Sequence, residues 1–188
     1  MVWTINKIVR LVDYTWGENN LYVLLEWIEG FTLDFLYKYF RSDLFEEEAK
    51  APDMEKYKKL IIKIMIDCIE TVSNLNKAGI IHRDLKLDNF MVRIKDKSLF
   101  YQICELKELN LLDENTDFDI VLIDIGCGKN IKNIDFNSSI ASGNFLFWSP
   151  EYDNDGNFEW SDWWSLGSIF LHLTYPMNNN NRMSKCYF

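Results

Sequence analysis

Apolar residues recur at every third or fourth position through one long stretch of the chain. Between Met54 and Ala78 they are Tyr57, Leu60, Ile61, Ile64, Met65, Cys68, Ile69, Val72 and Leu75. This spacing places them on one face of an α-helix, so it predicts an amphipathic helix over residues 54–78. Gly79 follows the last turn and is typical of the left-handed residue that ends a helix.

Shorter apolar runs on both sides of this helix predict strands and further helices. Strands are predicted at 7–14, 21–27, 79–81, 90–94 and 119–124, with 21–27 more buried than 7–14. Further helices are predicted at 31–40, 103–112 and 161–175, the last buried on nearly all sides and ended by Pro176. Within it, Trp163, Trp164 and His172 are predicted to serve packing rather than chemistry.

Length and charge narrow the class of protein. The 188 residues are 48% hydrophobic, which is enough for one globular domain with a core. With 20 Lys and Arg against 29 Asp and Glu, the formal charge of −9 argues against nucleic acid or an anionic membrane as a partner. Four widely spaced cysteines and the lack of any long apolar run predict a soluble intracellular protein, cytoplasmic and with reduced thiols.

The stretch "HRDLKLDN" (residues 82–89) concentrates chemically active side chains in a loop between two predicted strands. Asp84 has the carboxylate needed to orient and deprotonate a hydroxyl, and Lys86 has a charge that neutralises a phosphate oxygen. Asn89 offers an amide oxygen to a hard cation. A second carboxylate, Asp124, ends a predicted strand just before "IGCG".

These residues resemble motifs of one family. "HRDLKLDNF" is similar to the catalytic loop of eukaryotic-type protein kinases, and "DIG" at 124–126 is similar to their DFG motif. "GNFLFWSPE" at 143–151 resembles the end of a kinase activation segment, and "SDWWSLG" at 161–167 resembles the start of the central helix of the larger lobe. The resemblance implies an α+β, two-lobe kinase-like fold with a reduced small lobe and a shortened, mainly helical larger lobe.

The resemblance also implies roles for the polar residues, with ATP and magnesium as cofactors. Asp84 would be the catalytic base, and Lys86 would stabilise the transferring phosphoryl group. Asn89 and Asp124 would hold magnesium. Lys86 favours the serine/threonine class, and Asp162 would brace the catalytic loop.

For the adenine ring, the resemblance implies a site beside the segment that joins the two lobes. Leu25 would be the gatekeeper, and Met91 would form the apolar floor beneath the ring. The backbone carbonyl of Glu26 and the backbone amide of Ile28 would bond the ring edge.

The resemblance begins partway through the small lobe, at about Ile8. No glycine-rich phosphate loop precedes Ile8, and Lys7 stands in the wrong context to replace the phosphate-positioning lysine. The expected organisation is a partial kinase-like domain at 1–176, made of small-lobe strands and hinge (1–29) and larger lobe (30–176), followed by an asparagine-rich tail at 177–188.

Three interpretations of function stay open. The intact catalytic loop favours a serine/threonine protein kinase, whereas the missing phosphate loop favours a non-catalytic kinase-like binding module. The third interpretation is an incomplete kinase gene product. The expected partners are a protein substrate or a protein that binds, together with a further chain that completes the small lobe.

Overall fold

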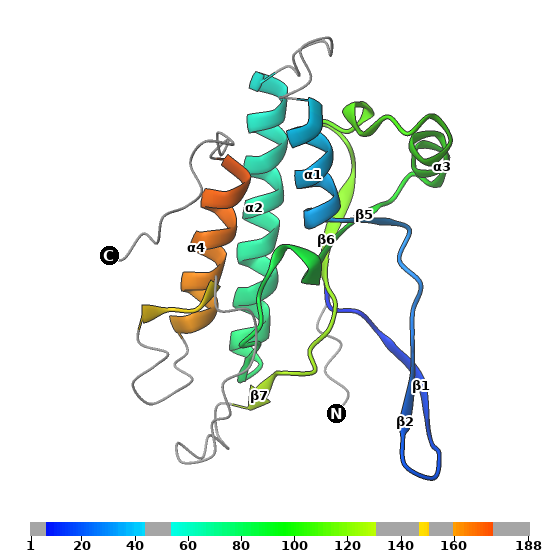
Figure 1. Cartoon of the computed structure of the whole chain (residues 1–188), viewed down its shortest axis with the longest axis vertical. Coiled ribbons are helices and arrows are strands. Elements are labelled where there is room, and N and C mark those ends of the chain that lie inside the picture. Colours follow the sequence, from blue (N-terminus) through cyan, green and yellow to red (C-terminus); the bar gives the residue numbers. More distant parts are fainter. Residues whose placement is uncertain (1–6, 44–53, 131–146, 151–159, 175–188) are drawn as a thin grey trace.

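The fold is known from a computed structural model, which describes residues 7–43, 54–130, 147–150 and 160–174. The predicted tail at 177–188 lies outside these residues. Helices and small antiparallel sheets are mixed along the chain, so the α+β prediction is confirmed (Figure 1). None of the helices in the described ranges is both long and apolar enough to cross a membrane.

The elements follow one another in a mixed order. The helices are α1 (Leu33–Asp43), α2 (Met54–Lys77), α3 (Lys97–Leu106) and α4 (Trp160–Thr174), with short 3-10 turns η1 (Leu87–Asn89) and η2 (Leu109–Leu111). The strands are β1 (Leu11–Trp16), β2 (Leu21–Leu25), β3 (Gly30–Thr32), β4 (Ile80–Ile81), β5 (Phe90–Ile94), β6 (Phe118–Leu122) and β7 (Lys129–Asn130).

Two predicted helices are displaced from their expected positions. The helix predicted at 31–40 begins at Leu33, because Gly30–Thr32 pair with β5 as the strand β3. The helix predicted at 103–112 lies instead at Lys97–Leu106, because Asp96 caps it by accepting hydrogen bonds from the amides of Ser98 and Leu99. Periodicity alone did not identify that cap.

Helix α2 lies at the centre of the core, with α1 on one side and α4 on the other (Figure 1). The Tyr57 hydroxyl donates to the Leu173 carbonyl oxygen on α4 at 2.8 Å, and its ring lies 4.9 Å from the Phe40 ring on α1. Burial raises the pKa of Tyr57 to about 12. The predicted helix is confirmed together with its buried face, except that Ile69 is exposed.

A three-stranded antiparallel sheet, ordered β3–β5–β6, packs against these helices. A Cβ at Gly30 would lie 2.1 Å from the Val92 carbonyl oxygen, so the close approach of β3 to β5 requires glycine there. At the other edge, the Val9 amide donates to the Leu122 carbonyl at 2.9 Å, and the Leu122 amide donates to the Lys7 carbonyl at 2.9 Å. The chain before β1 is therefore attached to β6.

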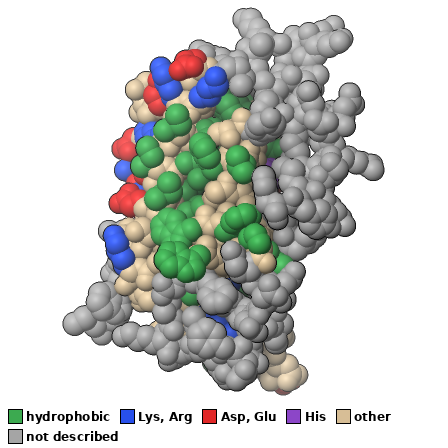
Figure 2. All heavy atoms as spheres, turned by 90° about the vertical axis from the view of Figure 1, so that its left-hand side faces the viewer, with side chains coloured by type: hydrophobic (Ala, Val, Ile, Leu, Met, Phe, Trp, Pro, Cys, Tyr) green, Lys and Arg blue, Asp and Glu red, His purple; other side chains and the backbone are tan. Residues whose placement is uncertain are grey.

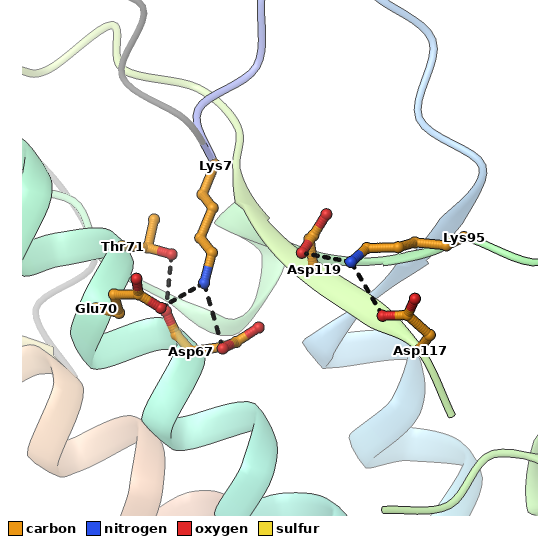
Figure 3. A network of polar contacts seen from close by, with 7 residues as sticks. All are labelled: Lys7, Asp67, Glu70, Thr71, Lys95, Asp117 and Asp119. Carbon is orange, nitrogen blue, oxygen red and sulfur yellow. Dashed lines mark hydrogen bonds and ion pairs between the residues drawn. The ribbon is translucent and has the colours of Figure 1, made fainter. Parts of the chain in front are cut away.

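The side chain of Lys7 fixes the same segment to α2, as Figure 3 shows. Its ammonium lies 2.6 Å from a carboxylate oxygen of Glu70 and 3.3 Å from one of Asp67. Both partners of Lys7 belong to α2 and neither is a candidate site residue, so the contacts of Lys7 agree with the prediction that it does not act as the phosphate-positioning lysine.

The hairpin of β1 and β2 extends away from the helices (Figure 1). Every residue of both strands is exposed, although the sequence predicted that the second strand would be the more buried; that prediction is wrong. Trp16 is 72% exposed, and Trp27, just after β2, is 87% exposed. Among the described residues, the two strands pair only with each other, and side chains on both faces of the hairpin are exposed.

Helix α4 buries only one side. Its outer stripe is apolar and exposed, and it consists of Trp160, Trp163, Trp164, Phe170 and Leu171. Figure 2 shows hydrophobic side chains gathered on this side of the molecule. The prediction that α4 is buried on nearly all sides is therefore wrong, whereas Trp163 and Trp164 are partly buried, at 36% and 42% exposed. The packing role of His172 is confirmed, because its ring lies 5.4 Å from Tyr37 and 6.0 Å from Phe147.

Candidate active site

The loop at 82–89 follows α2, with the short strand β4 between them. Gly79 has a φ of 81°, the left-handed conformation predicted for the residue that ends the helix. The chain then forms β4, passes through the loop and enters η1 and β5. His82, Arg83, Asp84 and Asn89 are all buried, although each is polar. Burying polar groups costs free energy, which hydrogen bonds offset.

Asp162, in the first turn of α4, bonds the backbone of this loop. Its carboxylate accepts hydrogen bonds from the His82 amide at 2.8 Å and from the Arg83 amide at 2.9 Å. Arg83 has a φ of 73°, which is strained for a residue with a side chain and is held in place by this bond. Burial raises the pKa of Asp162, while the two amide donors oppose that rise. The predicted bracing role of Asp162 is confirmed.

His82 supports the backbone of the residue that carries the key carboxylate. Its side chain is fully buried, and the Asp84 amide donates to its Nδ1 at 3.3 Å. Burial lowers the pKa of His82, which favours the neutral ring that an accepting Nδ1 requires. His82 and Asp162 therefore fix the loop from two sides.

Asp84, Lys86 and Asn89 form one bonded group. The Lys86 ammonium lies 2.9 Å from Asp84 Oδ2, and Asn89 Nδ2 donates to the Asp84 carbonyl oxygen at 2.8 Å. The hydrogen bond to Asp84 raises the pKa of Lys86, so the lysine is a cation at neutral pH. A carboxylate and a cation thus stand side by side, as proton transfer from a hydroxyl and charge neutralisation at a phosphate require.

The backbone brings Asp124 to the same end of the sheet. The Ile123 amide donates to the Asn89 carbonyl oxygen at 2.8 Å, which places the next residue, Asp124, beside Asn89. Asp124 lies two residues beyond Leu122, the last residue of β6, and has a φ of 60°. Its Oδ1 accepts from the Gly126 amide at 3.1 Å.

The oxygen atoms in this place suit magnesium. The side-chain amide nitrogen of Asn89 donates to the Asp84 carbonyl oxygen, so the side-chain amide oxygen of Asn89 is not used in that bond. Asp124 has a second carboxylate oxygen besides Oδ1, which accepts from the Gly126 amide. One carboxylate and one amide oxygen fit Mg²⁺, which keeps several water ligands and binds with few protein ligands.

The predicted adenine residues lie around the connection between β2 and β3. Leu25 ends β2 and is 44% exposed, whereas Ile28 is buried. Glu26 bonds β5 through its side chain, because its Oε1 lies 2.9 Å from an Arg93 guanidinium nitrogen. Met91 and Arg93 alternate with the buried residues of β5 and therefore share a face of that strand. The structure thus brings Glu26 to the side of β5 that carries Met91.

Sequence reasoning missed several residues near this connection. Arg93 contacts Glu26, while Lys97 and Tyr101, on α3, contact Glu29. No sequence spacing signals these pairs, because more than sixty residues separate the partners along the chain.

Only residues 147–150 of the predicted activation-segment motif are described, and the rest of 143–151 lies outside. The Ser165 hydroxyl on α4 donates to the Phe147 carbonyl oxygen at 2.7 Å. Phe147 and Ser149 are both buried, so this short segment is attached to α4 close to Asp162.

Comparison with known proteins identifies the family. The family model described as the protein kinase domain matches residues 2–186. A protein named "Probable serine/threonine-protein kinase" from Dictyostelium discoideum is 26% identical over 175 residues, which cover 89% of this chain and 22% of that protein. "Serine/threonine-protein kinase 1" of African swine fever virus is 33% identical over 94 residues, covering 49% of this chain and 26% of that protein.

A plant relative gives the same picture. The Arabidopsis thaliana "Serine/threonine-protein kinase AtPK1/AtPK6" is 25% identical over 155 residues, which cover 82% of this chain and 26% of that protein. The chain therefore spans about a quarter of the length of these relatives. Because the family model matches nearly the whole length and the motif residues stand together in one bonded site, this chain belongs to the protein kinase domain family.

Proposed function

We propose that this chain carries the phosphoryl-transfer site of a serine/threonine protein kinase, which uses Mg·ATP and a hydroxyl group of a protein substrate. The observation that carries the proposal is the bonded group of Asp84, Lys86 and Asn89, to which Asp124 is joined through the backbone. Lys86 and the names of the relatives support the serine/threonine class.

Each residue has one task in this proposal. Mg·ATP supplies the γ-phosphoryl group, and Asn89 and Asp124 hold the magnesium. Asp84 orients the substrate hydroxyl and takes its proton as the oxygen attacks phosphorus and the bond to the β-phosphate oxygen breaks. Lys86 neutralises charge on the transferred group. Leu25, Glu26, Ile28 and Met91 are proposed to bind adenine.

We further propose that transfer needs a second polypeptide segment, packed on the hairpin of β1 and β2, which completes the small lobe. The hairpin supports this, because its apolar side chains are exposed on both faces and a two-stranded hairpin alone is marginally stable in water. Without such a segment, the same chain is a nucleotide-binding module with little transfer. In this organisation residues 1–29 belong to the small lobe and hinge, and residues 30–176 to the larger lobe.

The central test measures transfer of labelled phosphate from Mg·ATP to a generic protein substrate. Asp84→Asn removes the base, and the matched control is Asp88→Asn, which removes an exposed carboxylate of the same loop. We expect Asp84→Asn to lower transfer by about 100-fold or more and Asp88→Asn to leave it unchanged. Equal background in the wild-type chain and Asp84→Asn would contradict transfer by this chain alone and would leave only the binding module for the isolated chain.

Nucleotide binding is tested separately by the thermal shift that Mg·ATP produces. We expect stabilisation of the wild-type chain and of Asp88→Asn, and none in Asp124→Ala, because binding to the native state alone raises its stability. A thermal shift without transfer identifies the binding module. If the wild-type chain shows neither shift nor transfer, the nucleotide proposal is wrong.

A further inference from the structure

The segment Glu26–Glu29, which joins the exposed hairpin to β3, is held by contacts from far along the chain. At its first residue, Glu26 Oε1 accepts from the Arg10 amide at 3.0 Å and pairs with the Arg93 guanidinium at 2.9 Å. The Glu26 amide donates to the Arg10 carbonyl oxygen at 3.0 Å. Glu26 is thus bonded to both β5 and the residue that precedes β1.

At the last residue, α3 provides a second attachment. Glu29 Oε2 lies 2.9 Å from the Lys97 ammonium, and its Oε1 accepts from the Tyr101 hydroxyl at 3.2 Å. The Ile94 amide donates to the Glu29 carbonyl oxygen at 3.0 Å. Helix α3 belongs to the long connection between β5 and β6, so this connection contacts the segment directly.

The attachments matter because the hairpin offers little support of its own. Among the described residues, the two strands before this segment pair only with each other, so the end of the segment next to β2 depends on the contacts of Glu26, and those of Glu29 strengthen the end next to β3. A backbone that is already ordered in its bound conformation binds more tightly, since less conformational entropy is lost on binding.

We propose that Arg93 and Lys97 are positioning residues for purine binding, acting through the ion pairs Arg93–Glu26 and Lys97–Glu29 that fix this segment. The proposal rests on the proposed function, which assigns the Glu26 carbonyl and the Ile28 amide to the ring. It gives the connection between β5 and β6 a role, because Arg93 precedes it on β5 and Lys97 begins α3.

The two ion pairs differ in strength. The side chains of Arg93 and Glu26 are 33% and 22% exposed, whereas Lys97 is 71% exposed. Solvent screens the Lys97 pair more, so its contribution is smaller. Arg93 also has a planar fork of donors that Lys does not reproduce, so Arg93→Lys restores only part of the contact.

The first measurement is amide hydrogen exchange of residues 26–29 without nucleotide. We expect exchange to accelerate about fivefold in Arg93→Ala and about twofold in Lys97→Ala, since the lost ion pairs hold the segment closed. The matched control is Lys95→Ala, which removes a cation of the same stretch. Lys95 pairs with Asp117 at 3.0 Å and with Asp119 at 3.3 Å (Figure 3), and not with Glu26 or Glu29, so we expect no change.

The second measurement compares the dissociation constants of Mg·ATP and of magnesium tripolyphosphate, which has the phosphates without the purine. We expect Arg93→Ala to raise the Kd for Mg·ATP by about five- to tenfold and Arg93→Lys by a smaller factor. The Kd for magnesium tripolyphosphate should stay unchanged in every variant, because Lys86, Asn89 and Asp124 are untouched.

Each contrary outcome has its own meaning. Unchanged exchange at residues 26–29 in Arg93→Ala overturns the claim that the ion pair fixes the segment. Equal weakening of both ligands overturns the positioning role, because it indicates a general structural defect. A wild-type chain that binds neither ligand overturns the proposed function and the purine role with it, whatever the exchange rates show.

Discussion

The hairpin of β1 and β2 and the loop at 82–89 distribute polarity in opposite ways. The hairpin consists largely of Leu, Val, Tyr and Trp, yet all of its residues are exposed. The loop carries His82, Arg83, Asp84 and Asn89, and all four are buried. The difference teaches that burial in this molecule follows from which elements lie against a segment, because α2, α4 and the sheet surround the loop and no described element covers the hairpin.

The same contrast appears in how polar groups are satisfied. Asp162, on a distant helix, accepts the two amides that the loop would otherwise bury without partners. In the hairpin, backbone groups that face the partner strand bond that strand, and water solvates the other polar groups. Tertiary contacts therefore hold the loop, while the hairpin depends on local pairing.

The largest expected effect compares an aromatic residue of the hairpin with one that directly follows the loop. Phe90 is fully buried where β5 follows the loop, so Phe90→Ala should lower the free energy of unfolding by about 3–5 kcal/mol through a cavity. Trp16→Ala should change it by no more than about 0.5 kcal/mol, since that ring is already in water. Denaturant unfolding of both variants measures the difference, and equal losses would show that the hairpin is covered in solution.

A smaller loss is expected when the bracing carboxylate is removed. Asp162→Ala leaves the buried amides of His82 and Arg83 without their acceptor, which should cost about 2–3 kcal/mol in the free energy of unfolding. Asp162→Asn keeps one acceptor oxygen and should cost less. Asp34→Ala, in the first turn of α1 beside exposed Lys38, is the control and should stay within about 0.5 kcal/mol. A result for Asp162→Ala as small as this control would refute the brace.

The smallest expected effect is at Lys7, which ties the base of the hairpin to α2 (Figure 3). Lys7→Met should cost about 1 kcal/mol near neutral pH, because it removes the ion pairs to Asp67 and Glu70 while keeping an apolar stem of similar length. Equilibrium unfolding of both chains across a range of pH is the measurement.

The direction of the pH dependence follows from the pKa shifts. Burial acts to lower the pKa of Lys7, but the hydrogen bonds and charges of Glu70 and Asp67 outweigh it, so the pKa lies above 10.5. The stability contributed by Lys7 is therefore complete below that value and is lost as pH rises through the raised pKa. Lys7 also holds the pKa of Glu70 below 4.5, so that contribution is lost as pH falls through the lowered pKa. A wild-type advantage that is constant from acid to alkali would contradict the ion pair.

Sequence reasoning succeeded where one short stretch carries its own signal. The periodicity of α2, the glycine at position 79 and the loop "HRDLKLDN" are local patterns, and each stands in the structure where it was predicted. Reasoning failed where the outcome depends on neighbours. Helix α4 is rich in apolar residues, but its outer tryptophans are exposed because packing requires a second surface as well as an apolar one.

The sequence by itself determined the helices and strands in outline, the identity of the polar loop and the family that its motifs indicate, because backbone periodicity and motif order are properties of the chain read in one dimension. Only the tertiary structure decided that Asp162 holds the loop, that Arg93 and Lys97 reach Glu26 and Glu29, and that the hairpin stays exposed. Those contacts join residues more than sixty positions apart, and the exposure of the hairpin depends on what lies around it, so neither leaves a periodic trace in the sequence.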